Sequence, residues 1–235
     1  MDEHAARASA FDEALDELLD ESEPEYASVE PWLRAVKAAL DDAPAGVTLT
    51  ARDAPHVASI PGAEGAECAF GPPERVALVG SVLLRTCVAP PGSPERPRAD
   101  VAVALPRTAL LEKDYLDYRY HTKRALYLQY LADALAAAGL LKEGVAGAYL
   151  EALGGDAHKP ALVLAPTKME EGDADDGASH ALPATDFEIR LIPCLPEGAF
   201  AAANGASGSG LSALGGSLLG GMKKLGELGK KTLVG

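Results

Sequence analysis

Cysteine is scarce in this chain of 235 residues, and its three copies, Cys68, Cys87 and Cys194, stand far apart. An odd number of cysteines without a spacing pattern fits neither a disulfide framework nor a zinc site. Long apolar runs are lacking as well, so the sequence supports neither a secretory signal nor a membrane span. Together these absences predict a protein of a reducing intracellular compartment without a membrane partner.

Aromatic residues are also few, at 5% of the chain, whereas hydrophobic residues of all kinds make up 48%. Hydrophobic content at this level argues against wholesale disorder, and the length suffices for one sizeable domain with appendages. We therefore expect a core built mainly from alanine, valine and leucine.

Basic residues are outnumbered by acidic ones, and the formal net charge of −14 would repel nucleic acid if it were evenly spread. The charge is unevenly distributed. Acidic residues gather between Asp12 and Glu30 and again between Glu170 and Asp176, whereas residues 113–124 and the tail after Met222 are net basic. The first acidic run is typical of a solvated arm, and contact with a basic partner is the alternative.

Periodicity and turn residues divide the chain into an ordered middle and two appendages. A helix is predicted from Pro31 to just before Ala43, and a longer one from about Asp114 to Ala138. Glycine and proline interrupt residues 46–73, which we expect to be loop and short extended pieces. Apolar and β-branched runs predict strands at residues 75–79, 100–105, 161–164 and 187–192. Residues 201–235 are too rich in glycine for a stable helix and are expected to be flexible.

The longer predicted helix carries the most distinctive residues of the chain. One apolar face recurs at helical spacing through Leu116, Tyr120, Tyr127, Leu131 and Leu135. A basic cluster falls largely outside that face and consists of Arg119, Lys123 and Arg124. With the interleaved Tyr115, Tyr118 and Tyr120, these cations are a candidate surface for RNA or for a protein partner. A buried tyrosine stripe beside solvated cations is the alternative, and in both interpretations the cations face solvent.

A second motif combines a turn with an acidic strand. The strand at 75–79 runs into Gly80-Ser81, and the next strand begins with Asp100. Nucleotidyltransferase folds of the polymerase β type use this order, because the Gly-Ser turn brings backbone N–H groups to a triphosphate. Two carboxylates spaced D-x-D on the next strand then hold the two metal ions of the reaction. In this chain the second of those positions is Ala102.

One carboxylate cannot position two divalent ions, so the sequence predicts no phosphoryl transfer. The third acid that such enzymes take from a later strand is missing from residues 161–164, although Glu188 on the last strand is a distant candidate. We interpret Gly80, Ser81 and Asp100 as the vestige of a nucleotidyltransferase motif. A tight turn followed by a strand-edge aspartate is the alternative.

No other motif predicts catalysis, a cofactor or a metal site. The acidic loop at 170–177 does not match a calcium loop, because the terminal ligand would be Pro183. His121, His158 and His180 lie in different predicted elements without a partner at ligand spacing. No serine or cysteine stands in the sequence context of a catalytic triad. We therefore expect no catalytic residue, no cofactor and no metal ligand.

Several blocks of the chain resemble a single family. They are Val79-Gly80-Ser81 with Asp100 to Pro106, the run from Lys113 to Leu128 with its Lys-Arg-Ala-Leu-Tyr-Leu sequence, and residues 158–164 and 189–193. They look like the first domain of the nucleolar RNA-associated protein (Nrap) family, over roughly residues 28–200. The chain then divides into an acidic arm at 1–27, an Nrap-type domain at 28–200 and a Gly/Ser/Leu/Lys-rich flexible tail at 201–235.

That resemblance implies an α+β fold of the nucleotidyltransferase type, with a mixed sheet and flanking helices but without catalysis. It further implies a scaffold or RNA-associated module of the small-subunit processome, acting in pre-ribosomal RNA processing and ribosome biogenesis. The expected location is the nucleus and nucleolus, and the expected partners are pre-ribosomal RNA and the U3 small nucleolar RNA–protein particle. Two alternatives remain open, an active metal-dependent nucleotidyltransferase and a purely protein-binding module.

Overall fold

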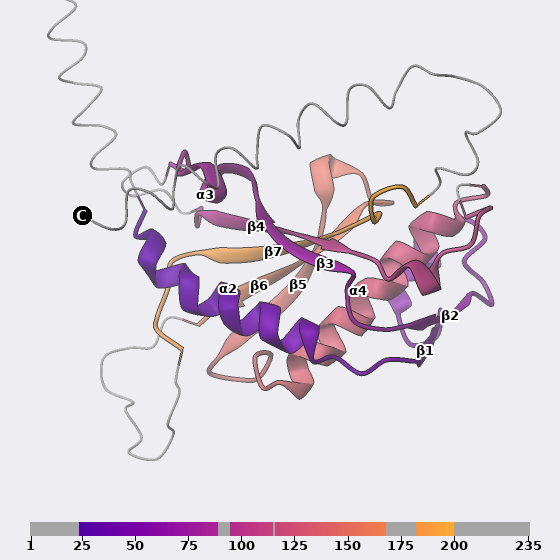
Figure 1. The fold of residues 1–235 in the computed structure, drawn as a ribbon, viewed down its shortest axis with the longest axis horizontal. Coiled ribbons are helices and arrows are strands. Elements are labelled where there is room, and N and C mark those ends of the chain that lie inside the picture. The colour runs from indigo at the N-terminus through magenta and orange to yellow at the C-terminus, as the bar shows by residue number, and fades with distance from the viewer. Residues whose placement is uncertain (1–23, 89–94, 115, 168–181, 200–235) are drawn as a thin grey trace, which may run out of the picture. The chain divides into compact units, whose positions relative to one another are not determined.

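The structure is a computed structural model that describes residues 24–88, 95–114, 116–167 and 182–199. Four parts of the sequence analysis lie outside these residues: most of the acidic arm, Tyr115, the acidic loop at 170–177 and the tail at 201–235. The described part contains a five-stranded sheet, a separate two-stranded hairpin and flanking helices (Figure 1).

The five-stranded sheet mixes parallel and antiparallel pairs. Its strands are β3 (Arg75–Val79), β4 (Arg98–Ala104), β5 (Ala146–Ala152), β6 (Pro160–Pro166) and β7 (Glu188–Cys194). They lie in the order β3-β4-β7-β6-β5, in which only the central pair β4 and β7 is parallel. The mixed sheet with flanking helices confirms the predicted α+β class, and it is compatible with a nucleotidyltransferase-like fold.

The two faces of this sheet differ because side chains alternate along each strand. On β4, Ala99, Val101 and Val103 point to one face and are buried in the main core. Asp100 and Ala102 point to the opposite face, which they share with Arg190, Ile192 and Val163 of the neighbouring strands. We call this opposite face the polar face of the sheet.

Two long helices cover the apolar face. They are α2 (Tyr26–Asp41) and α4 (Arg119–Ala137), and both contribute to the same core as the sheet (Figure 1). The short helix α3 (Gly80–Leu84) follows directly from β3 and contacts β4. Within the described residues, no helix combines the length and the hydropathy that crossing a bilayer would require.

Helix α2 begins five residues earlier than the sequence predicts, at Tyr26 instead of Pro31. Pro31 is accommodated inside the helix, where it forgoes one backbone hydrogen bond. Tertiary contacts outweigh that cost at the N-terminal end, since Val29 is buried there and Trp32 Nε1 donates to the carbonyl of Pro183 at 2.8 Å.

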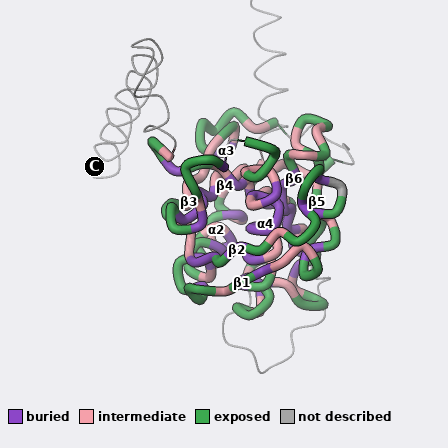
Figure 2. Tube along the Cα trace, turned by 90° about the vertical axis from the view of Figure 1, so that its right-hand side faces the viewer, coloured by how far each residue is buried: buried purple, intermediate pink, exposed green. Residues whose placement is uncertain are grey.

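The segment at 46–73 is more regular than predicted. It forms the hairpin of β1 (Val47–Thr50) and β2 (Glu67–Phe70), with a short 3-10 helix at Pro55–Ser59 between them. This hairpin lies against α4, because Phe70 contacts the Tyr127 ring and His56 Nε2 bonds the carbonyl of Ala125 at 2.9 Å. Helix α4 is therefore covered on a second side, and Figure 2 shows buried stretches gathered around it.

Two further 3-10 turns, Arg107–Ala109 after β4 and Leu153–Gly155 after β5, complete the described elements. Strand β5 itself was not predicted from the sequence. Its residues Gly147 to Leu150 are all exposed at the edge of the sheet, so they show no alternation of apolar and polar side chains.

Candidate functional site

The vestigial motif lies where β3, α3 and β4 meet. Gly80 ends β3 with a positive φ of +73°, a conformation that favours glycine. A Cβ atom built on Gly80 would approach Oδ2 of Asp100 at 3.3 Å. The structure thus brings Gly80 and Asp100 together as the motif predicts, and Ser81 follows in the first turn of α3.

A side chain at Gly80 is expected to strain this junction. We predict that Gly80→Val lowers the free energy of unfolding by about 1–3 kcal/mol, because it combines a left-handed backbone with crowding against Asp100. Urea unfolding monitored by circular dichroism measures the change. Gly147→Val is the matched control, since a Cβ at Gly147 meets no atom within 4 Å and its φ is not left-handed. Equal stability of the two variants would contradict this placement of the turn.

The carboxylate of Asp100 forms an ion pair with an arginine. Arg190 on β7 stands directly opposite Asp100 in the parallel register, and its guanidinium bonds both carboxylate oxygens. Nε lies 2.8 Å from Oδ1 and Nη2 lies 3.1 Å from Oδ2. These hydrogen bonds raise the pKa of Arg190, so the guanidinium stays charged. The neighbour of the aspartate is thus a fixed cation.

The pair belongs to a wider network on the polar face. Glu151 on β5 accepts from Nη1 of Arg190 at 3.4 Å and from Nη1 of Arg98 at 3.0 Å. Arg98 also donates through Nε to Oε2 of Glu188 at 3.1 Å. The hydroxyl of Tyr149 donates to the same Oε2 at 3.1 Å. Each acid of this face is therefore held by at least one arginine.

The polar face lacks the carboxylates of a two-metal centre. Ala102 pairs with Ala77 and Ile192, so its neighbours supply no acid to replace the missing one. Glu188, the distant candidate for the third acid, is paired in register with Arg98 and bonded to it. Among the residues that the structure describes, no group of three histidine, cysteine, aspartate or glutamate side chains is arranged to hold a metal ion.

The basic cluster does not form the predicted surface. Only Arg119 is exposed, with 55% of its side chain accessible and an ion pair to Asp117 at 3.8 Å. The Lys123 side chain is 15% exposed, and its Nζ donates to Oδ2 of Asp114 at 2.7 Å and to the carbonyl of Ala109 at 2.6 Å. Arg124 is 4% exposed and donates through Nε to the carbonyl of Pro193 at 3.0 Å.

The prediction that Lys123 and Arg124 face solvent is therefore wrong. The cause differs for the two residues: Lys123 is enclosed by the turn after β4 and by Asp114, whereas Arg124 points to β7 and bonds the carbonyl of Pro193. The start of the helix was also misplaced. Asp117 and Tyr118 adopt positive φ values of 52° and 58°, so the helix begins at Arg119 and leaves Leu116 exposed in the preceding turn. Tyr127 and Leu131 are buried as predicted, whereas Tyr120 is only partly buried.

Two histidines that the sequence separates come together in the structure. His121 Nδ1 lies 3.2 Å from the carbonyl oxygen of His158, which precedes β6. The ring of Tyr118 packs against both imidazoles, at centroid distances of 6.0 Å and 5.8 Å. Sequence spacing gave no signal for this contact, because 37 positions separate the two histidines. His180 lies outside the described residues.

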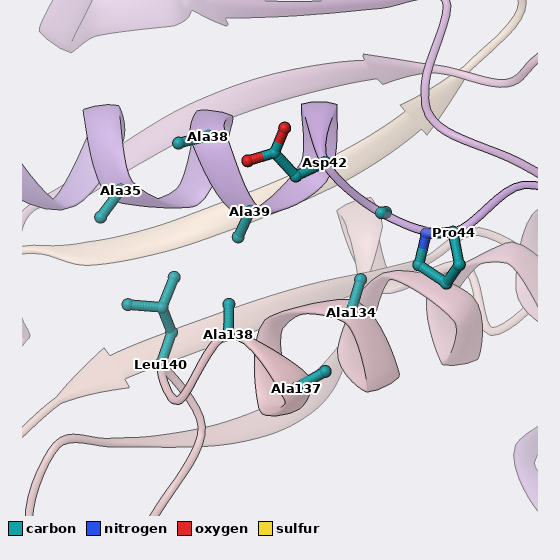
Figure 3. A pocket seen from close by; sticks show the side chains of 10 residues that line it. Ala35, Ala38, Ala39, Asp42, Pro44, Ala134, Ala137, Ala138 and Leu140 are labelled. Atoms are coloured by element: carbon teal, nitrogen blue, oxygen red, sulfur yellow. The ribbon is translucent and has the colours of Figure 1, made fainter.

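A hollow of about 450 Å³ lies elsewhere, between the C-terminal halves of α2 and α4 (Figure 3). Its wall is formed mainly by alanines of both helices, with Leu140 and Pro44 at the ends. Asp42 is the one charged side chain in the lining, and no lysine or arginine is present there. The hollow therefore offers no group that would bind phosphate or fix a substrate.

Comparison with known proteins identifies the family. The family description "Nrap protein domain 1" matches residues 45–204, a range that includes every strand of the structure. The chain belongs to the Nrap family. The resemblance seen in the sequence is thereby confirmed, and helix α2, which precedes the matched range, packs into the same core.

Relatives of this Nrap chain carry the name "Nucleolar protein 6". The protein of Mus musculus is 33% identical over 184 residues, which are 78% of this chain and 14% of the mouse protein. The Homo sapiens protein is 38% identical over 127 residues, or 53% of this chain and 10% of the human protein. The Xenopus tropicalis protein is 38% identical over 102 residues, or 43% of this chain and 8% of the frog protein. The chain thus spans a small share of the length of these relatives, none of which has an enzyme name.

Proposed function

We propose that this chain is a non-catalytic, nucleotidyltransferase-like module that acts in ribosome biogenesis. The bidentate pairing of Asp100 by Arg190 is the observation that carries the proposal. The relatives are named as nucleolar proteins, and on that kinship this chain is a nuclear, nucleolar protein. Small-subunit processome proteins, the U3 particle and pre-ribosomal RNA are the proposed partners, as the Nrap resemblance implies.

The absence of catalysis follows from charge. A two-metal mechanism needs several carboxylates that converge on two divalent ions about 4 Å apart. Here the one aspartate of the motif is neutralised by a guanidinium that lies in the position opposite it on the next strand. A metal ion would have to displace that ion pair and would then find Ala102 in place of a second ligand. The fold is kept while the chemistry of the site is replaced by a structural ion-pair network.

We predict that the protein incorporates no nucleotide. Incubation with labelled nucleoside triphosphates, an RNA primer and either Mg²⁺ or Mn²⁺ should give no extension, and calorimetric titration with Mn²⁺ should give no saturable heat. Asp100→Asn is the control, because it removes the only carboxylate of the motif. Incorporation by the parent that disappears in Asp100→Asn would establish the alternative of an active nucleotidyltransferase.

The acidic balance of the chain favours protein contacts over direct RNA contacts as the basis of assembly. Its net charge of −14 is unfavourable toward phosphate backbones, and in the basic cluster Arg124 is buried and Lys123 is only 15% exposed and paired with Asp114. A filter-binding titration with pre-ribosomal RNA at two salt concentrations separates the two modes. Binding that weakens steeply with salt supports direct RNA contact, and absent binding supports a module that binds protein.

The domain boundaries remain part of the proposal. We propose that residues 28–200 form the Nrap-type domain, preceded by the acidic arm at 1–27 and followed by the tail at 201–235. The family match at 45–204 and the packing of α2 support this division. Helix α2 begins at Tyr26, so its first two residues precede the proposed boundary at residue 28.

A further inference from the structure

Arg124 is the only buried lysine or arginine in the described part of the chain. It makes one hydrogen bond, from Nε to the carbonyl of Pro193, while its Nη1 atom is buried and has no hydrogen-bond partner among the described residues. No described carboxylate forms an ion pair with it, although the whole chain has 35 acidic residues against 21 lysines and arginines. A buried guanidinium without a counter-charge is costly, and an unsatisfied donor of this kind indicates a missing partner.

The position of Arg124 defines where that partner would lie. Side chains of a helix tilt toward its N-terminus, so Arg124 in the second turn of α4 points back toward the first turn. Burial lowers the pKa of Arg124, while the hydroxyl of Tyr120, the thiol of Cys194 and the carboxylate of Asp156 oppose that shift. These three groups come from the first turn of α4, the end of β7 and the loop between β5 and β6. The hydrogen bond from Nε to the carbonyl of Pro193 places the guanidinium between the start of α4 and the end of β7.

A second unpartnered nitrogen lies in the same region. His158, in the loop between β5 and β6, has a buried Nδ1 atom without a hydrogen-bond partner among the described residues. Its carbonyl is bonded to His121 in the first turn of α4, which fixes this loop against the helix. The two unsatisfied nitrogen atoms thus belong to residues held at the same end of α4.

This end of α4 also lacks a compensating acidic side chain. The N-terminus of a helix carries a partial positive charge that an acidic side chain in the first turn ordinarily offsets. Helix α4 has no acid in its first turn and no side-chain cap, although the carbonyls of Leu116 and Asp114 accept from the backbone N–H groups of Arg119 and Tyr120. The nearby cations Arg119 and Lys159 add positive charge, partly offset by Asp117 and Asp156. The expected partner is an anion.

We infer that the N-terminal end of α4, with Arg124, His121 and His158, is a binding site for a phosphate-type oxyanion. A tetrahedral oxyanion accepts hydrogen bonds from several directions, which suits a guanidinium and an imidazole near the positively polarised end of a helix. Tyr118 is 51% exposed and its ring packs on both imidazoles, so this part of the site lies close to the surface. The inference does not depend on the proposed function, because Asp100 and Arg190 are not part of this site.

Inorganic phosphate is the probe for the first experiment. The full chain is melted in increasing phosphate at constant ionic strength, with chloride as the balancing anion. Since a ligand of the native state stabilises it by mass action, the Tm of the parent should rise with the logarithm of phosphate concentration above Kd. A Tm that does not respond to phosphate beyond the chloride control would overturn the inference, and water would then satisfy Arg124.

Two variants assign the response to the site. Arg124→Met keeps the length of the side chain and removes its charge and donors, and it should weaken phosphate affinity by about tenfold or more. Arg119→Met is the matched control on the same helix, since Arg119 is exposed and should leave the response nearly unchanged. An equal response of the parent and both variants would show non-specific binding and overturn the site.

Arg124→Met removes a buried group and can also lower stability, so the site needs a second test. His158→Leu provides a second test at the loop, and phosphorus NMR of inorganic phosphate with the parent protein measures binding without any substitution. Line broadening of the phosphate signal that is lost in His158→Leu supports the site. Broadening that is absent with the parent, or unchanged in a folded His158→Leu, contradicts it.

A final experiment asks whether the bound phosphate is free or belongs to an RNA end. Short oligoribonucleotides with a 5′-phosphate and with a 5′-hydroxyl are compared by fluorescence anisotropy, with inorganic phosphate as competitor. Tighter binding of the phosphorylated oligonucleotide, reversed by phosphate, supports the site with an RNA end as its ligand. Equal binding of the two oligonucleotides, together with the phosphate-dependent Tm, supports the site with free phosphate as its ligand.

Discussion

Truncation of Tyr127 to alanine is expected to lower the free energy of unfolding by about 3–5 kcal/mol. Tyr127 is 0% exposed and lies between α4 and the β1–β2 hairpin. Its ring stacks on Tyr130 at a centroid distance of 5.3 Å and contacts Phe70 at 5.2 Å. The substitution therefore leaves a cavity bordered by two other aromatic rings that cannot collapse into it without moving both α4 and the hairpin.

The matched control for this prediction is Tyr127→Phe. It keeps the ring and removes only the hydroxyl, which donates to the carbonyl of Gly71 at 3.3 Å. A long hydrogen bond of this kind contributes about 1 kcal/mol, so the phenylalanine variant should remain close to the parent in urea unfolding. If Tyr127→Ala and Tyr127→Phe are equally stable, the ring does not carry the packing assigned to it.

The elements that the sequence predicts well are those with a strong local pattern. Strand β3 matches its predicted range, and β4, β6 and β7 differ from their predicted ranges by one or two residues at each end. Each of these strands has apolar residues that face the core. Strand β5 has alanine and glycine instead, and it exists because β6 supplies its hydrogen bonds. The pairing with β6 is a tertiary interaction, and the residues of β5 alone do not predict it.

The hairpin of β1 and β2 was missed for a related reason. Its strands have four residues each and are separated by the turns and the 3-10 helix that glycine and proline introduce. The glycine and proline residues at 46–73 do mark turns, as predicted. Between these turns lie two short strands that pair with each other. The error at the basic cluster has a related cause. Lys123 and Arg124 are held by Ala109, Asp114 and Pro193, and the periodicity of the helix alone does not place these partners.

The candidate site was predictable only in part. Local order in the sequence located Gly80 and Asp100 and identified Ala102 as the missing ligand. The partner that neutralises Asp100 lies 90 positions away on β7, and only the parallel register of β4 and β7 brings it opposite the aspartate. Sequence reasoning can detect the loss of a carboxylate from its spacing, whereas the arginine that takes its place requires the three-dimensional pairing.

Replacement of Asp114 by alanine is the second substitution with a large expected effect, about 3–5 kcal/mol of unfolding free energy. The Asp114 side chain is 1% exposed and accepts from Nζ of Lys123 at 2.7 Å. The same oxygen, Oδ2, accepts from the backbone N–H of Leu111 at 2.7 Å. Alanine would leave Lys123 with a shielded charge and no carboxylate, and it would deprive the turn before α4 of its hydrogen-bond acceptor.

A double-mutant cycle separates this ion pair from simple packing. Lys123→Met removes the cation and leaves a buried carboxylate, so it should also be destabilising. The double variant Asp114→Ala with Lys123→Met removes both charges, and it should lose much less stability than the sum of the two single changes. This outcome would establish the basic residue as part of a buried structural network. Strictly additive effects, or a stable Asp114→Ala, would return Lys123 to the solvent-facing role that the sequence alone suggested.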